Sequence, residues 1–158
     1  MITKADGRYR ELFLRNGLRA ADVVLAHREA LGVLRDDIET AHLDAHSDTA
    51  WPVEAIPAYE RALSMARTRT DAGTRSKGDD LMGIDIDVRD DMQFDVLQTL
   101  APFTIHAEAW RRNRVIFSAG DTGTALWIAV TAPQEAQLLA RLDAAGVPPT
   151  AFTTHPHR

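Results

Sequence analysis

Apolar residues recur at heptad spacing across residues 20–46, and this pattern constrains the fold more than any other feature of the chain. The members of the main seam stand three or four residues apart: Val24, His27, Leu31, Leu34, Ile38, Ala41 and Ala45. Such spacing places side chains on one face of an α-helix. A narrower second stripe holds Leu25, Gly32 and Leu43. The pattern therefore predicts one long helix that is covered on two sides and forms the spine of the fold.

A second helix is expected over residues 53–69, after a break at Pro52. Its stripe residues recur at helical intervals: Ile56, Tyr59, Leu63 and Ala66. Pro57 would fall in the first turn, where proline is tolerated because the first backbone N–H groups of a helix have no intrahelical partner. With a short helix over residues 8–18, the two long helices predict an N-terminal α-helical hairpin that occupies residues 1–72.

The pattern changes after a polar loop at residues 73–83. Ile84, Ile86 and Val88 alternate with charged residues, which is typical of a strand with one buried face. We expect a helix over 92–100, strands over 104–110, 114–119 and 125–131, and a closing helix over 134–145, with a tail that frays or adds an edge strand. The order of elements in residues 84–158 is then βαβββα. The predicted fold is a single compact α+β domain, with the hairpin packed on a small, mainly antiparallel sheet of about four strands.

Composition narrows the functional classes. The chain has 158 residues, of which 45% are hydrophobic and 26% charged, and no cysteine. No apolar run approaches the roughly 18 residues of a membrane span, and no apolar segment follows the charged amino terminus as in a secretory signal. We therefore expect a cytoplasmic protein with no membrane partner and no disulfide. The formal net charge of −5 argues against nucleic acid as a partner, because phosphate contacts need a basic surface.

Three histidines stand out in the long predicted helix. Four residues apart on a helix, His42 and His46 would point the same way, as two imidazoles must to share a zinc ion. Leu43 stands where zinc proteases carry a glutamate, and no third ligand is evident. We therefore predict no metal site and keep zinc at this pair as an alternative to a half-buried or exposed pair. His27 lies in the centre of the seam, and we interpret it as a hydrogen-bonded core histidine or an interface residue. Protonation of His27 would place a charge in a buried position.

Asp85 and Asp87 place two carboxylates on one strand face roughly 6.5–7 Å apart, a spacing that a divalent cation could bridge. Gly73 and Thr74 stand upstream of them. This arrangement resembles the nucleotidyltransferase superfamily, in which a Gly-Ser turn holds the nucleotide phosphates and an Asp-x-Asp strand binds magnesium. The resemblance implies that Gly73 and Thr74 contact phosphate and that Asp85 and Asp87 hold the metal, with Glu108 as the third carboxylate. The chain departs from the family in having Thr74 for serine and no apolar strand before Gly73. An amphipathic strand that exposes aspartates to water is the interpretation we favour.

Clustered carboxylates also suggest a binding surface. Residues 79–95 form an acidic stretch, which supplies six candidates: Asp79, Asp80, Asp85, Asp87, Asp90 and Asp91. A surface of this kind attracts basic proteins quickly and needs no catalytic geometry. Our leading hypothesis is a non-enzymatic protein-interaction module, regulatory or inhibitory, that self-associates as a homo-oligomer, binds a basic protein partner and uses no cofactor. The alternative is a metal-dependent nucleotidyl- or phosphoryl-transfer enzyme that uses Asp85 and Asp87.

Overall fold

The computed structural model describes residues 8–75 and 81–156, which form four α-helices and one seven-stranded sheet with three single-turn 3-10 helices between them. The strands are β1 (Tyr9–Leu14), β2 (Thr40–Leu43), β3 (Ile84–Ile86), β4 (His106–Arg111), β5 (Arg114–Gly120), β6 (Trp127–Thr131) and β7 (Phe152–Thr153). The helices are α1 (Ala20–Leu34), α2 (Ile56–Asp71), α3 (Asp91–Leu100) and α4 (Ala132–Ala144). The predicted α+β class is confirmed.

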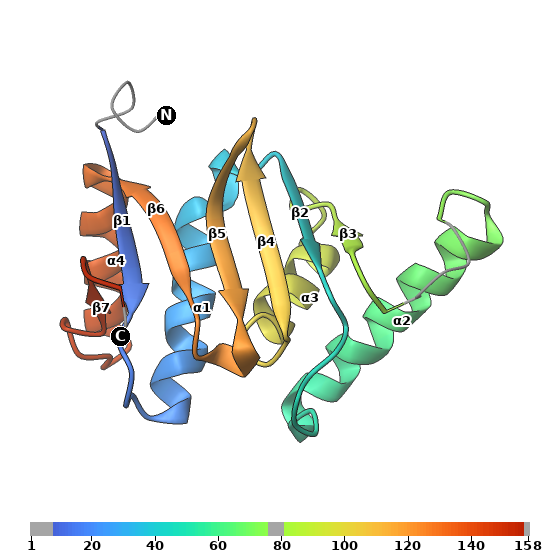
Figure 1. Cartoon of the computed structure of the whole chain (residues 1–158), viewed down its shortest axis with the longest axis horizontal. Helices are drawn as coiled ribbons and strands as arrows, with labels where there is room; N and C mark the ends of the chain where they lie inside the picture. The colour runs from blue at the N-terminus through green and yellow to red at the C-terminus, as the bar shows by residue number, and fades with distance from the viewer. Residues whose placement is uncertain (1–7, 76–80, 157–158) are drawn as a thin grey trace.

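The sheet has the strand order β3-β2-β4-β5-β6-β1-β7, and every neighbouring pair is antiparallel. Helices α1, α3 and α4 lie against one face, whereas α2 lies beside the β3 edge (Figure 1). We call the face that carries these three helices the covered face and the opposite one the open face. In the part of the chain that the structure describes, no helix lies on the open face.

The C-terminal half follows the predicted order of elements. From β3 to α4 the chain runs strand, helix, three strands and helix, and β7 is the additional edge strand. Local sequence signals define both helix starts. The Asp90 carboxylate accepts hydrogen bonds from the backbone N–H groups of Met92 and Gln93 and so caps α3. Thr131 and Gln134 form a capping box at the start of α4.

The single long helix over residues 20–46 is wrong. Helix α1 ends at Leu34, a 3-10 turn follows over Arg35–Asp37, and Thr40–Leu43 is strand β2. Asp36 and Asp37 stand where the negative end of the helix dipole disfavours carboxylates, so the helix stops before them. The heptad pattern was misleading beyond this point because Ala41 and Ala45 fit both a helical seam and strand alternation.

The N-terminal helical hairpin is also wrong, and the sheet is larger than the four strands we expected. Residues Tyr9–Leu14 form β1 and not a short helix, with Leu12 and Leu14 buried in alternation with more exposed neighbours. Helix α2 exists close to its expected position, but it packs against α3 and β3. The two helices of the expected hairpin are therefore separated by β2, which inserts between them in the chain and joins the sheet.

The core lies between the covered face and its helices. Strands β1 to β6 contribute fully or almost fully buried side chains to it, among them Leu12, Ile128, Phe117, Ala109, Leu43 and Ile84. His27 on α1 is completely buried in this layer, where the edge of its ring meets Phe117. Its Nδ1 lies 2.7 Å from the Val23 carbonyl oxygen, and burial lowers its pKa to about 4. The expectation of a hydrogen-bonded core histidine is confirmed.

Side chains from two helices bind the outer side of β3. Arg69 on α2 donates from Nη1 to the Asp85 carbonyl oxygen at 2.6 Å, and the Gln93 side chain on α3 accepts from the Asp87 backbone N–H at 2.7 Å. Arg69 also donates to that glutamine at 3.4 Å. These contacts attach α2 and α3 to the edge of the sheet. No described helix is both long and apolar enough to span a membrane.

Candidate functional site

The open face carries a continuous row of side chains across six strands. Strand register places them in the following order from β3 to β1: Asp85, His42, Glu108, Ser118, Trp127 and Phe13. Each stands next in sequence to residues that are buried on the covered face, because successive side chains on a strand point to opposite faces. The row therefore brings together residues from distant parts of the chain on one surface.

Three ionisable side chains of the open face converge on one point, and we call them the His-Glu cluster: His42, His106 and Glu108. The Glu108 Oε1 atom lies 3.5 Å from His42 Nε2 and 3.4 Å from His106 Nε2. The two imidazole rings have centroids 5.8 Å apart. One potential ligand atom from each residue lies within 4.8 Å of the other two. All three side chains are partly exposed, so solvent reaches the cluster.

The backbone under the cluster is fixed by adjacent central strands. His42 on β2 stands directly opposite Glu108 on β4, and His106 is two residues earlier on β4. The buried Thr104 hydroxyl donates a hydrogen bond to the Asp44 carbonyl oxygen and accepts one from the His106 backbone N–H at 3.3 Å. Thr104 thus joins the end of β2 to the start of β4 at the point where His106 begins the strand.

An aromatic platform continues the open face beyond the cluster. It consists of three half-buried aromatic residues and one half-buried valine: Phe13, Trp110, Trp127 and Val115. Phe13 is paired with Trp127, and Trp110 with Val115. The Trp127 indole N–H donates to the Glu11 carboxylate at 2.9 Å, which fixes the orientation of that ring. Trp127 is therefore oriented by a carboxylate at the border of the platform.

The histidine pair proposed from the sequence is not the group that the fold assembles. His42 lies on β2, which ends at Leu43, so the helical turn that would have placed His46 beside it is absent. Four residues of extended chain span roughly 13 Å, against roughly 6 Å for four residues of helix. The neighbours of His42 with potential ligand atoms are His106 and Glu108, and His46 is not a member of that group. The sequence offered one signal for it, the alternation of His106, Glu108 and Trp110 on one strand face.

The residues of the nucleotidyltransferase resemblance lie in three different settings. Asp85 stands on the open face beside His42, whereas Asp87 follows the end of β3 and accepts from the Arg89 backbone N–H at 3.0 Å. Gly73 and Thr74 follow the C-terminal end of α2, and the Thr74 hydroxyl donates to the Arg69 carbonyl oxygen at 3.2 Å. The negative end of a helix dipole is an unfavourable environment for phosphate. The geometry therefore brings Glu108 and Asp85 onto one face, and within residues 8–75 and 81–156 the Gly73-Thr74 turn is not a phosphate-binding turn beside them.

The acidic candidates divide between the open face and local structural contacts. Asp79 and Asp80 lie outside the described residues. Asp90 caps α3, and Asp91 forms an ion pair with Arg35 at 2.6 Å. Of the acidic candidates that the structure describes, Asp85 is the one whose register places it on the open face.

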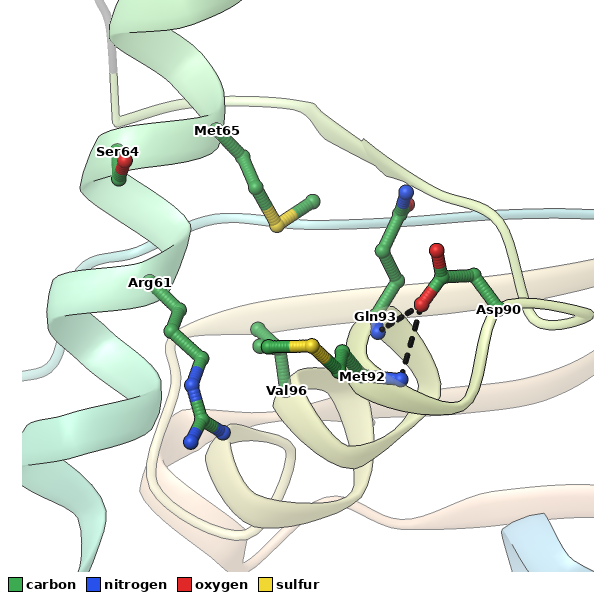
Figure 2. A pocket seen from close by; sticks show the side chains of 7 residues that line it. All are labelled: Arg61, Ser64, Met65, Asp90, Met92, Gln93 and Val96. Carbon is green, nitrogen blue, oxygen red and sulfur yellow. Dashed lines mark hydrogen bonds between the residues drawn. The ribbon is translucent and has the colours of Figure 1, made fainter.

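Apart from the open face, a concavity lies between α2 and α3 and has a volume of about 220 Å³. Figure 2 shows its walls, with Met65 from α2 and Met92 and Val96 from α3. Arg61 on α2 and the capping Asp90 are the charged residues in its lining. Its surface is mainly apolar, so it offers packing area and few groups for chemistry.

Comparison of the chain with models of known protein families, with curated proteins and with solved structures finds no match. No relative therefore carries a function over to this chain. What the site can do follows from its own residues and their geometry.

Proposed function

We propose that the chain is a protein-binding module that holds a basic protein partner on the open face of its sheet. The observation that supports the proposal most directly is that aromatic side chains and carboxylates share a face on which no helix lies in the described chain. The proposal keeps the acidic protein-interaction module expected from the sequence and moves its centre from the acidic stretch to the sheet.

The apolar part of the surface supplies contact area. Trp110, Trp127 and Phe13 are large side chains that remain only half-buried although the same strands hold a complete core on their other side. Aromatic residues are enriched where proteins bind one another, and exposed apolar patches bordered by polar groups mark such sites. The hydrogen bond from Trp127 to Glu11 orders one anchor in advance, which reduces the entropy lost on binding.

The charges on this face determine which partner fits. Asp85, Glu108 and Glu11 contribute carboxylates to the open face, and the whole chain has a formal net charge of −5. Arginine and lysine side chains of a partner would pair with these carboxylates and stack on the tryptophan rings. A second copy of the chain would instead bring carboxylates toward carboxylates, so we favour a different, basic protein as the occupant.

The face is large enough for a specific interface. Seven strands at about 4.8 Å spacing span roughly 29 Å, and the longest strands, with six or seven residues, extend roughly 20 Å, whereas β2, β3 and β7 are shorter. The flat area is thus below roughly 600 Å², and side-chain relief adds to it. A standard interface buries about 800 Å² on each partner. The open face, with its borders, therefore accommodates one partner of ordinary size.

The experiment is affinity purification from the native cell followed by quantitative binding of the recovered protein. Ser118 lies in the centre of the open face, between Glu108 and Trp127 in the row. We expect Ser118→Arg to weaken binding at least about tenfold, by about 1.4 kcal/mol, through bulk and repulsion of basic groups. Gln137→Arg adds the same charge at an exposed position of α4 and should leave binding unchanged.

Three results would contradict the proposal. The first is that Ser118→Arg binds as tightly as the wild type, the second is that the partner is acidic, and the third is that binding does not weaken as salt increases. Self-association stays a prediction, which sedimentation tests directly. A dimer in the wild type that becomes a monomer in Ser118→Arg would assign the open face to a second copy and replace the basic partner.

A metal-dependent nucleotidyl- or phosphoryl-transfer enzyme that uses Asp85, Asp87 and Glu108 is the alternative. The observation that favours it is that Asp85 and Glu108 flank His42 in one registered row. Thermal melts with Mg²⁺, Mn²⁺ and nucleoside triphosphates test it. The alternative is contradicted if none of these ligands raises the melting temperature of the wild type, or if they raise it equally in Asp85→Ala.

A further inference from the structure

We infer that His42, His106 and Glu108 form a binding site for a Zn²⁺ ion on the open face. This inference goes beyond the proposed protein-binding function and does not depend on it, because the three ligands come from this chain alone. It also replaces the pair His42 and His46, which the sequence had offered as an alternative zinc site. Three properties of the cluster support a zinc site: its distances, its donor atoms and the rigidity of its backbone.

The distances match the edges of a zinc coordination tetrahedron. Zinc lies about 2.0–2.1 Å from imidazole nitrogen and about 2.0–2.2 Å from carboxylate oxygen, so two ligands of one tetrahedral ion are about 3.3 Å apart. Glu108 Oε1 lies 3.4 Å from His106 Nε2 and 3.5 Å from His42 Nε2. The remaining edge is within 4.8 Å, so a small rotation of the two rings toward each other closes the site.

The same distances are long for direct hydrogen bonds. Charge-assisted N–H···O contacts between imidazolium and carboxylate are ordinarily about 2.7–2.9 Å. Both nitrogens instead stand at 3.4–3.5 Å from one carboxylate oxygen, and the rings approach each other with centroids 5.8 Å apart. An arrangement in which two imidazole nitrogens stand at ligand-edge distance from one carboxylate oxygen, with all three groups within 4.8 Å of one another, fits a shared cation better than a pairwise ion pair.

The donor set selects zinc among the common divalent ions. Two imidazole nitrogens and one carboxylate oxygen are the protein ligands of a well-known class of zinc sites, in which the fourth position is open to water. Mg²⁺ and Ca²⁺ prefer oxygen ligands throughout, and this cluster offers a single carboxylate. The side chains of His42, His106 and Glu108 are 33%, 42% and 23% exposed, so water can occupy the fourth position.

The backbone holds the ligands before a metal arrives. His42 and Glu108 are direct cross-strand partners, and His106 and Glu108 share one face of β4. Leu43, which follows His42, and Ala107, which lies between His106 and Glu108, are fully buried on the covered face. Neither strand can therefore rotate its ligands away without disturbing the core. Sites on strands inside a sheet are more precise than sites on loops. Binding therefore requires only side-chain adjustment.

The test is a zinc titration of the metal-stripped full chain by calorimetry, with absorption of Co²⁺ as a spectroscopic probe of coordination. We expect one zinc ion per chain and a Co²⁺ spectrum typical of four-coordinate nitrogen and oxygen ligation. His42→Gln, His106→Gln and Glu108→Gln should each weaken zinc binding at least about 100-fold, because even outer-shell changes cost 10–100-fold. Zinc should raise the melting temperature of the wild type and not of these variants.

His46→Gln and His155→Gln are the matched controls, since each removes a histidine outside the cluster. Both should bind zinc as the wild type does. Melting curves without metal verify that every variant is folded, and three independent ligand substitutions keep the test valid if one of them is not. Zinc binding that survives all three ligand substitutions, or that is lost equally in His46→Gln, would overturn the inference.

Phe13→Arg separates this site from the proposed protein-binding function, because Phe13 on β1 lies three strands away from Glu108 on β4 in the open-face row. That variant keeps all three ligands and should retain zinc binding while partner binding is weakened. Absence of zinc binding in the wild type overturns the metal site and leaves the protein-binding proposal standing. Absence of a basic partner overturns the protein-binding proposal and leaves the metal site standing.

Discussion

The two faces of the sheet differ in composition although the same strands build both. On β2 the fully buried Leu43 follows His42 of the open face, and on β6 the fully buried Ile128 follows Trp127 of the open face. The covered face consists of aliphatic, alanine and phenylalanine side chains packed under three helices. The open face carries imidazoles, carboxylates and indoles.

This difference separates stability from binding at the level of adjacent residues. Burial of apolar area on the covered face supplies most of the free energy of folding. The open face contributes less, so its side chains can be chosen for recognition at small cost to the fold. Substitutions of adjacent residues of one strand should therefore change stability by very different amounts, depending on the face that each residue occupies.

The largest expected effect is on the covered face of β2. Leu43 is 0% exposed, and Leu43→Ala should lower the free energy of unfolding by about 3 kcal/mol through lost burial and a cavity. His42→Ala, one residue earlier on the open face, should change it by less than about 1 kcal/mol. Urea denaturation of the two variants measures both values. Equal losses would show that the faces do not divide these roles.

A second large effect comes from His27 in the layer under the covered face. Burial lowers its pKa to about 4 in the folded state, whereas the unfolded chain has the ordinary value near 6.5. Between these values the unfolded chain binds a proton that the folded chain does not. Stability is thus highest above pH 6.5 and decreases as pH falls toward 4, by about 3 kcal/mol from this residue.

His27→Leu removes this titration and provides the comparison. The carboxylates and the other histidines contribute equally in both proteins, so they cancel in the difference. We expect the loss of unfolding free energy between pH 7.5 and 4.5 to be smaller in His27→Leu than in the wild type. Parallel pH profiles for the two proteins would mean that the pKa of His27 is the same in the folded and the unfolded chain.

An intermediate effect is expected where Thr104 joins β2 to β4. Its buried hydroxyl bonds to the Asp44 carbonyl oxygen and to the His106 backbone N–H, and Thr104→Val leaves these groups without that partner. The cost should be about 2 kcal/mol. The exposed Thr124 hydroxyl also donates to a backbone carbonyl, that of Asp121, and Thr124→Val should cost less than about 1 kcal/mol. Thermal denaturation of the pair measures the contrast.

The smallest effect is expected on the aromatic platform. Trp127→Phe keeps an aromatic ring but removes the hydrogen bond of 2.9 Å to Glu11. Because the site is half-buried, the loss of stability should be about 0.5–1 kcal/mol. Binding of the partner should weaken more than this, since the free phenyl ring is no longer oriented. A stability loss above about 2 kcal/mol would mean that Trp127 belongs to the core.

The C-terminal half of the fold could be predicted because its signals are local. Strand alternation at Ile84 and Ile86 depends on a few adjacent residues, and so do the apolar intervals of the helices expected over 92–100 and 134–145. Residues 35–45 could not be predicted in this way, because Ala41 and Ala45 satisfy a period of 3.5 and a period of 2 at once. The deciding residue was Leu43, which is 0% exposed and lies outside the main heptad seam.

The candidate site illustrates the same limit at longer range. The alternation of His106 with Glu108 is visible in the sequence, and so is His42. Their convergence depends on the pairing of β2 with β4, which are separated by α2, β3 and α3. No local pattern encodes such a pairing, because it results from packing of the whole sheet. The misassigned helix then hid His42 from the strand partners that it meets in the structure.

The contacts of Arg69 and Gln93 with the outer side of β3 have a consequence for how the protein behaves when concentrated. A bare outer strand templates the addition of further strands from other molecules and so leads to fibrils. Here a guanidinium group and an amide engage the Asp85 carbonyl and the Asp87 N–H, the positions that an incoming strand would need. At the opposite edge β7 pairs with β1 over Phe13 and Leu14. The β3 edge is therefore closed to incoming strands, and the broad surface beside it stays available for recognition without inviting polymerisation there.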